Sequence, residues 1–397
     1  MSAAKTPPSQ RAAYAAHVYD VVIVGGSLAG AAAAIHLAHR GRSVVIIEQH
    51  AFPRRKVCGE GLLPIGVDEL DRLGLRDSVE AAGEPLRRLR FAAGSHHVEA
   101  VLPRQGIGVR RTTFDALLLD AARTAGVEVC HGTATRLLVR SGRAHAVECV
   151  GGHTCPGRVV IGADGLHSRI RRLAGLETRS VGTRYGAAAH GQVPSLEPGV
   201  VSVSFHDGYE TYVTPVGGDS VNAVMLLPRP TLRELGHDPA AAIASRLAAT
   251  PELAGIEFEE PVKVAGPFPR TARRAYRGNV VLAGDAAGFF DGVTGEGMGV
   301  ALASARLCAD AVVAHLETGS IAPFRGYDSA RRDLVRNSTL LGKLTLALGS
   351  RPSVARLAIR NLARQPETFE RLVAISGGAL GLRALRPSDV LAMLTGS

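Results

Sequence analysis

Short apolar runs alternate with helical segments near the start of the chain, and this alternation predicts a parallel sheet. Residues 21–24 (Val-Val-Ile-Val) form a β-branched run of the kind that is buried on both faces of such a sheet. A glycine-rich turn and an Ala-rich helix to about Arg40 follow, and the next apolar run, residues 44–47, ends at Glu48. We therefore predict a βαβ unit of roughly thirty residues, with an acidic side chain at the end of its second strand.

Further strands are predicted from the same kinds of pattern. Residues 159–161 and 280–283 are continuous apolar runs typical of buried strands, and residues 127–150 predict a strand followed by a hairpin. Residues 86–102 and 182–228 alternate between apolar and polar positions, which is typical of an antiparallel sheet with one covered face.

Helical spacing is present in separated segments and then dominates the end of the chain. The segments are residues 64–73, 112–124 and 297–316, together with every periodic stretch beyond residue 325. In the second segment Thr112 or Thr113 is the expected N-cap, and Asp115 is expected in the first turn.

The order of these elements predicts a nucleotide-type α/β domain that is assembled from three separated pieces of chain, with an inserted antiparallel sheet. The predicted boundaries are residues 18–66, 103–181 and 265–316 for the α/β domain, 67–102 and 182–264 for the inserted substrate domain, and 317–397 for a helical C-terminal region. Residues 1–17 are predicted to form a flexible tail.

Composition fits a folded protein with a large core, because the 397 residues are 46% hydrophobic and 21% charged. The formal net charge is +10, which indicates either a solvated basic surface or attraction to an anionic substrate, cofactor, carrier protein or membrane. Residues 351–364 are amphipathic and basic, so they either pack on their own protein or contact a membrane surface. No basic stretch is interleaved with aromatic residues, and we expect no nucleic-acid binding.

The cysteines predict a reducing compartment. Their number is odd, no CxxC pair occurs and no signal peptide is recognised, so we predict reduced thiols and a cytoplasmic protein. The apolar segment at residues 21–34 is too short and too interrupted by glycine to span a bilayer. Histidines do not show metal-ligand spacing, and we expect no metal site.

The turn after the first strand matches the dinucleotide-binding fingerprint at its outer positions. Gly25 permits the tight turn and Gly30 permits close packing of helix on strand, while Ser27 stands in place of the middle glycine. The helix that follows offers free N–H groups to a pyrophosphate. Glu48 lies eighteen residues past Gly30, where an acid would accept both hydroxyls of an adenosine ribose and disfavour a 2′-phosphate.

Later turns also follow predicted buried strands. Residues 162–171 contain Asp164, which can organise the turn, and Gly165, which gives it backbone freedom. Asp285, in a Gly-Asp-Ala-Ala turn, is placed to accept hydroxyls of a sugar-alcohol chain. Residues 295–299 open the long helix, and their N–H groups would face the negative N1–C2=O edge of a flavin and stabilise its anionic reduced form.

These motifs, in this order and spacing, resemble those of the class A FAD-dependent monooxygenase and geranylgeranyl reductase superfamily, the p-hydroxybenzoate hydroxylase-like flavoproteins. The resemblance covers roughly residues 18–315. It implies an α/β fold: a Rossmann-type FAD-binding domain with an inserted antiparallel β-sheet substrate domain and a helical C-terminal region. It also implies that FAD is held by Gly25, Ser27, Leu28, Ala29, Gly30, Glu48, Gln49, Arg55, Cys58, Gly59, Arg111, Thr133, Ala134, Asp164, Gly165, Gly284, Asp285, Gly295, Glu296, Gly297 and Met298.

Residues 55–61 (Arg-Lys-Val-Cys-Gly-Glu-Gly) indicate one branch of this superfamily. They are similar to a loop of the geranylgeranyl reductase branch, in which the Cys lies near the flavin. Gly288 also fits that branch, since many aromatic hydroxylases carry His there. Of the branch's Tyr-x-Trp-x-Phe-Pro signature the chain keeps only Pro215 and an aromatic residue, Tyr212, at the Trp position. Flavin-dependent halogenases usually carry a Trp-x-Trp-x-Ile-type motif, and this chain has no Trp.

Cys58, Glu60 and Tyr212 are the candidate catalytic residues. Cys58 is either a flavin-side residue or an ordinary buried thiol. Glu60 is either an acid/base group or a loop residue that bonds the backbone, and Tyr212 is either a substrate contact or a packing residue.

The leading hypothesis is an FAD-dependent monooxygenase, a hydroxylase or epoxidase, that uses NAD(P)H and O2 on an apolar, secondary-metabolite-like substrate, either free or carrier-bound or anionic. The alternative is a reductase or dehydrogenase of the geranylgeranyl reductase type, in which Cys58 or a neighbour supplies or takes the proton. A halogenase and a non-redox FAD-dependent cyclase are further alternatives. Because FAD uses the fingerprint, NAD(P)H must visit a shared cleft, or a separate reductase partner must deliver the electrons.

Overall fold

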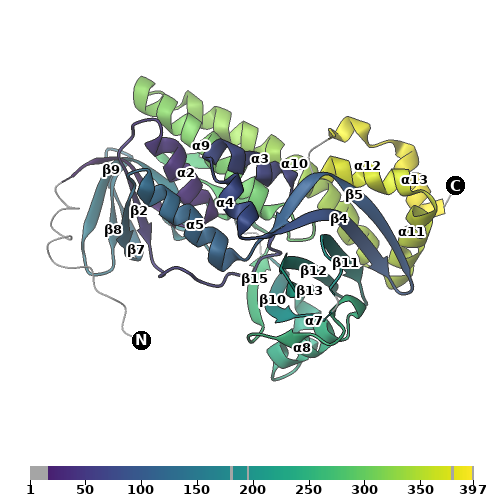
Figure 1. Ribbon diagram of the computed structural model, residues 1–397. Helices are drawn as coiled ribbons and strands as arrows, with labels where there is room; N and C mark the ends of the chain where they lie inside the picture. The colour runs from purple at the N-terminus through teal and green to yellow at the C-terminus, as the bar shows by residue number, and fades with distance from the viewer. Residues whose placement is uncertain (1–16, 179–181, 195, 377–379, 396–397) are drawn as a thin grey trace.

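The computed structural model describes residues 17–178, 182–194, 196–376 and 380–395, and it contains two large sheets with helices packed around them (Figure 1). The first sheet lies at the N-terminal end of the molecule, the second lies in the middle, and the yellow C-terminal helices cover part of the second sheet. Residues 1–16 of the predicted tail lie outside the described residues.

The first sheet contains the predicted parallel core. Its strands are β1 (Tyr19–Val24), β2 (Val44–Glu48), β6 (Glu128–His131), β7 (Ala134–Arg140), β8 (Arg143–Cys149), β9 (Thr154–Gly162), β17 (Tyr276–Arg277) and β18 (Val280–Leu282). The order is β17-β18-β9-β1-β2-β6, with the β7–β8 hairpin beside β9. Since β1 pairs in parallel with β2 and β9, and β9 with β18, three distant pieces of chain build one sheet, as predicted.

Helix α2 (Leu28–Ala38) packs on β1 and β2 of the first sheet, and α5 (Arg111–Thr124) and α9 (Gly297–Thr318) pack on α2. Helix α9 has the length and hydropathy to cross a membrane, but 61% of its most apolar window is buried inside the protein. We therefore assign α9 as a core helix. The shorter helices of this part are α3 (Pro64–Leu73), α4 (Arg76–Ala81) and α6 (Arg169–Leu173).

The start of α5 differs from the prediction. The N-cap is Arg110, not Thr112 or Thr113, and the helix begins at Arg111. A carboxylate oxygen of Glu60 accepts a hydrogen bond from the Arg111 backbone N–H at 2.7 Å, so a distant loop satisfies this helix end instead of a local hydroxyl. Asp115 accordingly lies beyond the first turn, where it is fully buried.

The second sheet is mostly antiparallel, as predicted. Its strands are β3 (Gly61–Leu62), β4 (Glu84–Ala93), β5 (His96–Gly108), β10 (Arg184–Gln192), β11 (Val200–Phe205), β12 (Glu210–Gly217), β13 (Ser220–Pro228), β14 (Glu257–Phe258) and β15 (Lys263–Phe268). The order is β14-β10-β13-β12-β11-β4-β5-β3, with β15 beside β10. One pair, β4 with β11, is parallel, which requires the long connection between these strands in place of a hairpin.

Smaller elements complete this part of the molecule. They are α7 (Arg229–Glu234), α8 (Pro239–Ala248), the short pair β16 (Arg270–Thr271) and β19 (Gly288–Phe289), and the 3₁₀ turns η1 (Pro251–Leu253), η2 (Gly284–Ala287) and η3 (Leu382–Ala384). The predicted domain boundaries at residues 66 and 102 do not coincide with the ends of the strands. β5 continues past residue 102 within the second sheet, and β3, before residue 66, belongs to the same sheet. The division into domains stays a prediction.

The C-terminal region is helical, as predicted, with α10 (Ala322–Gly349), α11 (Pro352–Arg364), α12 (Pro366–Ser376) and α13 (Pro387–Thr395). Helices α11 and α12 pack on β4 and β5. Ala358 and Ile359 on α11 are buried, while Arg356 and Arg360 are exposed. The apolar side of this basic amphipathic helix is therefore used within the chain, and a membrane contact through its basic side stays a prediction.

Candidate functional site

A cavity of about 340 Å³ is lined by residues of the first sheet's turns, the second sheet and the C-terminal helices. Twelve of the predicted cofactor residues line it: Ser27, Leu28, Ala29, Cys58, Gly59, Arg111, Gly165, Gly284, Asp285, Gly295, Gly297 and Met298. Motifs that are far apart in the sequence therefore meet at one wall of this cavity.

Two fingerprint glycines fit the site because no side chain can stand in their place. A Cβ on Gly30 would lie 1.8 Å from the backbone oxygen of Gly25. Gly25 has a φ of +101°, and its Cβ would lie 2.4 Å from the Ala163 oxygen. These contacts bring the N-terminus of α2 against the ends of β1 and β9, which is the packing that the dinucleotide fingerprint requires.

A buried ion pair fixes the middle of this turn. The Arg111 guanidinium donates to Ser27 Oγ at 2.8 Å and to both carboxylate oxygens of Asp115 at 2.9 Å. Burial opposes the charge on Arg111, but Asp115 and Cys58 outweigh it and raise the pKa of Arg111. Because the Ser27 side chain makes no capping bond to α2, the first N–H groups of this helix remain available to a phosphate.

Glu48 ends β2 beside the same turn and is buried. One carboxylate oxygen accepts from the Gly26 N–H at 2.7 Å, and the other accepts from the His50 N–H at 2.8 Å. Each oxygen keeps acceptor capacity for a ribose hydroxyl. Thr133 and Ala134 follow β6, the strand that pairs with β2, whereas Gln49 is exposed just past Glu48.

A buried arginine, Arg171, lies between the turn that contains Asp164 and the turn that contains Asp285. Asp164 accepts from the backbone N–H groups of Arg169 and Ile170 at 2.6 and 3.1 Å, and so organises the start of α6 as predicted. Arg171, with no exposed surface, donates to the Ala286 carbonyl at 3.0 Å. Its guanidinium thus holds the Asp285 turn against the Asp164 turn at the cavity wall.

The N-terminus of α9 faces the cavity through Gly295, Gly297 and Met298. Glu296 is the N-cap, but its side chain makes no capping bond. It turns instead toward Ser376 on α12, at 2.9 Å, and Ser338 on α10. Burial raises the pKa of Glu296 to about 8, so the group is largely neutral at pH 7, and the helix N–H groups remain free for a ligand.

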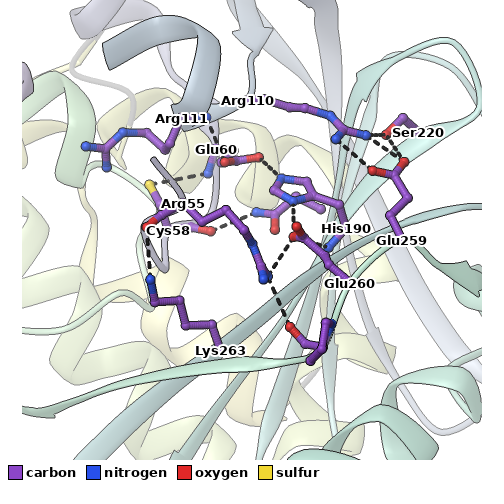
Figure 2. A network of polar contacts seen from close by, with 12 residues as sticks. Arg55, Cys58, Glu60, Arg110, Arg111, His190, Ser220, Glu259, Glu260 and Lys263 are labelled. Carbon is purple, nitrogen blue, oxygen red and sulfur yellow. Dashed lines mark hydrogen bonds and ion pairs between the residues drawn. The ribbon is translucent and has the colours of Figure 1, made fainter. Parts of the chain in front are cut away.

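The loop before β3 places Cys58 and Glu60 at the cavity wall (Figure 2). Asn222 donates to the Cys58 carbonyl at 2.7 Å and holds the loop on the second sheet. Glu60 is buried, has a φ of +59°, and lies with one carboxylate oxygen 2.6 Å from His190 Nε2. Arg55 is not among the residues that line the cavity, and it forms an ion pair with Glu260 at 2.6 Å.

Tyr212 also lines the cavity, from β12. Its hydroxyl donates to the Val293 carbonyl at 3.2 Å, and burial raises its pKa well above the usual value. The side chain therefore stays a neutral phenol that both packs in the sheet and contacts the cavity, so the two interpretations from the sequence are compatible.

Beyond Tyr212 the cavity continues as an apolar chamber between the second sheet and the C-terminal helices. The sheet contributes Leu89, Phe91, Val201, Val203 and Phe205, and the helices contribute Leu341, Leu344, Ala355, Ala358, Ile359, Leu362, Phe369, Leu372, Val373 and Met393. Phe91 and Phe205 are partly buried: their rings contact each other edge to face, and both also line this hollow. The chamber suits a long hydrocarbon chain.

Several site residues were missed by sequence reasoning. Lys56 lines the cavity with Nζ 4.0 Å from Asp285, and burial followed by the charge of Arg111 lowers its pKa. Its position in the Cys58 loop was the available signal. Asp115 had a local signal, because it lies four residues after Arg111 on the same helix. His190 had none, because its partner Glu60 is distant in sequence.

The comparison with known proteins now bears on this geometry. The FAD binding domain family matches residues 18–339. The chain belongs to this family. Menaquinone reductase of Mycolicibacterium smegmatis is 30% identical over 332 residues, which are 73% of this chain and 75% of that protein. Digeranylgeranylglycerophospholipid reductase 1 of Methanopyrus kandleri is 32% identical over 322 residues, 75% of this chain and 81% of that protein.

Among solved structures, the flavin-dependent brominase Bmp2 aligns with a TM-score of 0.82 over 95% of this chain and 97% of that chain, at 19% identity, which shows a shared fold. The predicted fold class and the predicted superfamily are confirmed. The protein is an FAD-dependent oxidoreductase.

The residues of the site fit FAD. The N-terminus of α2 has no side-chain cap and lies at the cavity, where it can hold a pyrophosphate, and Glu48 can accept the ribose hydroxyls. The uncapped N-terminus of α9 lies at the same cavity, where it can face the flavin ring. The assignment of individual cofactor contacts, including Gln49, Arg55, Thr133 and Ala134 away from the cavity lining, stays a prediction.

Proposed function

We propose that this FAD-dependent oxidoreductase is a reductase that saturates a carbon–carbon double bond in a long isoprenoid chain. The apolar chamber carries the proposal. It joins the cavity lined by Cys58 and Gly297 without interruption, and a row of aliphatic and aromatic side chains lines it. A chain that enters this chamber would bring its double bonds past the flavin end of the site.

The names of the relatives support the same substrate class. One is a menaquinone reductase and the other a digeranylgeranylglycerophospholipid reductase, and both names describe molecules that carry long isoprenoid chains. The Cys-Gly-Glu-Gly loop and Gly288 resemble the reductase branch of the superfamily. We therefore rank reduction above oxygenation, which was the leading hypothesis from the sequence alone.

When bound, FAD supplies the hydride chemistry, and NAD(P)H is the electron donor in this proposal. The protein's own contribution is binding, orientation and proton supply. Leu89, Phe91 and Phe205 exclude water and hold the hydrocarbon, while the Tyr212 phenol and the Cys58 thiol border its path. Helix α9 directs its free N–H groups at developing negative charge.

The test is an anaerobic assay of the FAD-loaded protein, chemically reduced and mixed with a geranylgeranyl lipid or menaquinone. We expect a product heavier by two hydrogen atoms per reduced bond, detected by mass spectrometry. A product that forms only with oxygen and gains an oxygen atom would instead establish a monooxygenase.

A bulky substitution that fills part of the chamber tests the proposed substrate class directly. Ala358→Phe fills space between α11 and the sheet, so it should slow reduction of the long chain about tenfold or more and spare a short prenyl analogue. Ala363→Phe is the matched control, since Ala363 is exposed on the same helix. Equal losses for long and short substrates would show that the chamber does not hold the chain.

A further inference from the structure

Glu60, His190 and Glu260 form a hydrogen-bonded triad at β10 of the second sheet (Figure 2). His190 on β10 has Nε2 2.6 Å from a Glu60 carboxylate oxygen and Nδ1 2.6 Å from a Glu260 carboxylate oxygen. The exposed fraction of the side chains rises along this line, from 2% for Glu60 to 8% for His190 and 20% for Glu260. One end of the triad therefore lines the cavity and the other reaches solvent.

From this geometry we propose that Glu260 orients His190, and that His190 supplies protons through Glu60 to the substrate cavity. The inference rests on the proposed function, because reduction of a double bond consumes one hydride and one proton. Glu60 is then the catalytic acid at the cavity wall, and His190 and Glu260 are positioning residues that keep it supplied.

The proton balance is simple. The Nε2 proton of the imidazolium moves to Glu60, which leaves a neutral imidazole whose remaining proton on Nδ1 is held by Glu260. Glu60 passes that proton into the cavity and returns to a carboxylate. After the product leaves, water restores the imidazolium, so each cycle consumes one proton and moves no electron through the triad.

The charges around His190 favour its protonated form. Burial lowers the pKa of the imidazole, but its bonds to Glu60 and Glu260 outweigh burial and raise that pKa above the usual value. Arg110, at the start of α5, acts in the opposite direction, yet it is paired with Glu259 at 2.7 Å. The residue opposite His190 on β13 is uncharged, Asn222.

A purely structural clamp is the competing interpretation, since Glu60 also accepts from the Arg111 N–H and Arg55 joins Glu260. The two interpretations differ in what they predict. A clamp affects stability alone, whereas a proton supply also sets the pH profile and the solvent isotope effect of the reaction.

The decisive variant is Glu260→Gln, because it leaves the cavity wall intact. The matched control is Glu259→Gln, whose side chain bonds Arg110 and Gln192 and makes no described bond to the imidazole. In single-turnover reduction of the lipid by FAD-loaded protein, Glu260→Gln and His190→Gln should slow the rate about tenfold or more. For Glu260→Gln the alkaline fall of activity should move to lower pH, and the solvent isotope effect should rise. Glu259→Gln should change the rate less than about twofold.

A second measurement needs no substrate. Imidazole ¹⁵N NMR of the protein should show His190 protonated above its ordinary range, with Nδ1 keeping its proton when the ring becomes neutral. Glu260→Gln should lower that pKa, and Glu259→Gln should shift it less. An unchanged titration in Glu260→Gln would overturn the triad even if the lipid is reduced. Failure of the wild-type protein to reduce any isoprenoid lipid would overturn the proposed function, while the NMR result would still decide the triad.

Discussion

The two ends of the cavity are built on different principles. At the flavin end, backbone contacts and buried polar groups fix the shape: Gly30 abuts the Gly25 oxygen, and Arg111 is locked to Asp115. At the chamber end, side-chain volume alone sets the shape, with half-buried residues such as Phe91 and Phe205 around a hollow. We therefore expect the chamber end to tolerate substitutions better than the flavin end.

The difference between the two ends matches the different requirements of a cofactor and a substrate. A cofactor that never changes can be matched by rigid backbone, whereas a flexible hydrocarbon requires only a surface that excludes water. Substitutions at the two ends should therefore differ in kind as well as in size.

The largest effect is expected at the fingerprint. Gly30→Ala places a methyl group 1.8 Å from the Gly25 oxygen, so α2 must move away from β1. We expect FAD binding to weaken roughly a thousandfold or more and the purified protein to lose its yellow colour. The measurement is absorbance after gel filtration. Gly326→Ala, on α10 with open space around it, is the control and should keep the colour. A yellow Gly30→Ala protein would contradict the rigid half of the comparison.

Substitution of two phenylalanines, one in the packed core and one at the chamber wall, tests how tightly each region is packed. Phe114 on α5 is fully buried, so Phe114→Ala should lower the free energy of unfolding by about 3–5 kcal/mol. Phe91→Ala should cost roughly 1–2 kcal/mol, because part of that ring already faces empty space. Chemical denaturation of the FAD-loaded variants measures both values. Equal costs would mean that the chamber wall is as tightly packed as the core.

The smallest of the three effects is expected where the two ends meet, at Glu296. Its pKa is raised to about 8 in the folded protein, so the folded state holds a proton that the unfolded chain releases near pH 4.5. The stabilisation is therefore complete at low pH and is lost as the pH rises through 8. Glu296→Gln should abolish roughly 2 kcal/mol of pH dependence between pH 6 and 8, measured by denaturation at several pH values. An unchanged pH dependence would show that Glu296 ionises freely.

The sequence predicted the flavin end well, because its signals are local. The run at residues 21–24, the glycines that follow and Glu48 lie within one βαβ unit, and each element appears where the pattern placed it. The N-cap of α5 was wrong for the opposite reason. The group that satisfies the Arg111 N–H is Glu60, from a loop on another part of the chain.

Neither the apolar chamber nor the triad of Glu60, His190 and Glu260 could be predicted from the sequence, and the physical reason is the same for both. Helical spacing beyond residue 325 identified α10 to α12 but could not say which sheet they cover. His190 contacts Glu60 and Glu260 only because β10 passes the Cys58 loop within the second sheet. Contacts of this kind depend on how distant segments pack together, and the periodic pattern of one segment carries no information about that packing.

The place of β18 in the first sheet has a consequence for synthesis in the cell. This strand pairs with β9, and the turn and helix that follow it complete the flavin end of the cavity. A nascent polypeptide cannot enclose its prosthetic group until translation has passed α9, near residue 318. Cofactor loading is therefore a late event in biogenesis, and any pause or truncation before that point leaves a product with the fingerprint turn but no closed site.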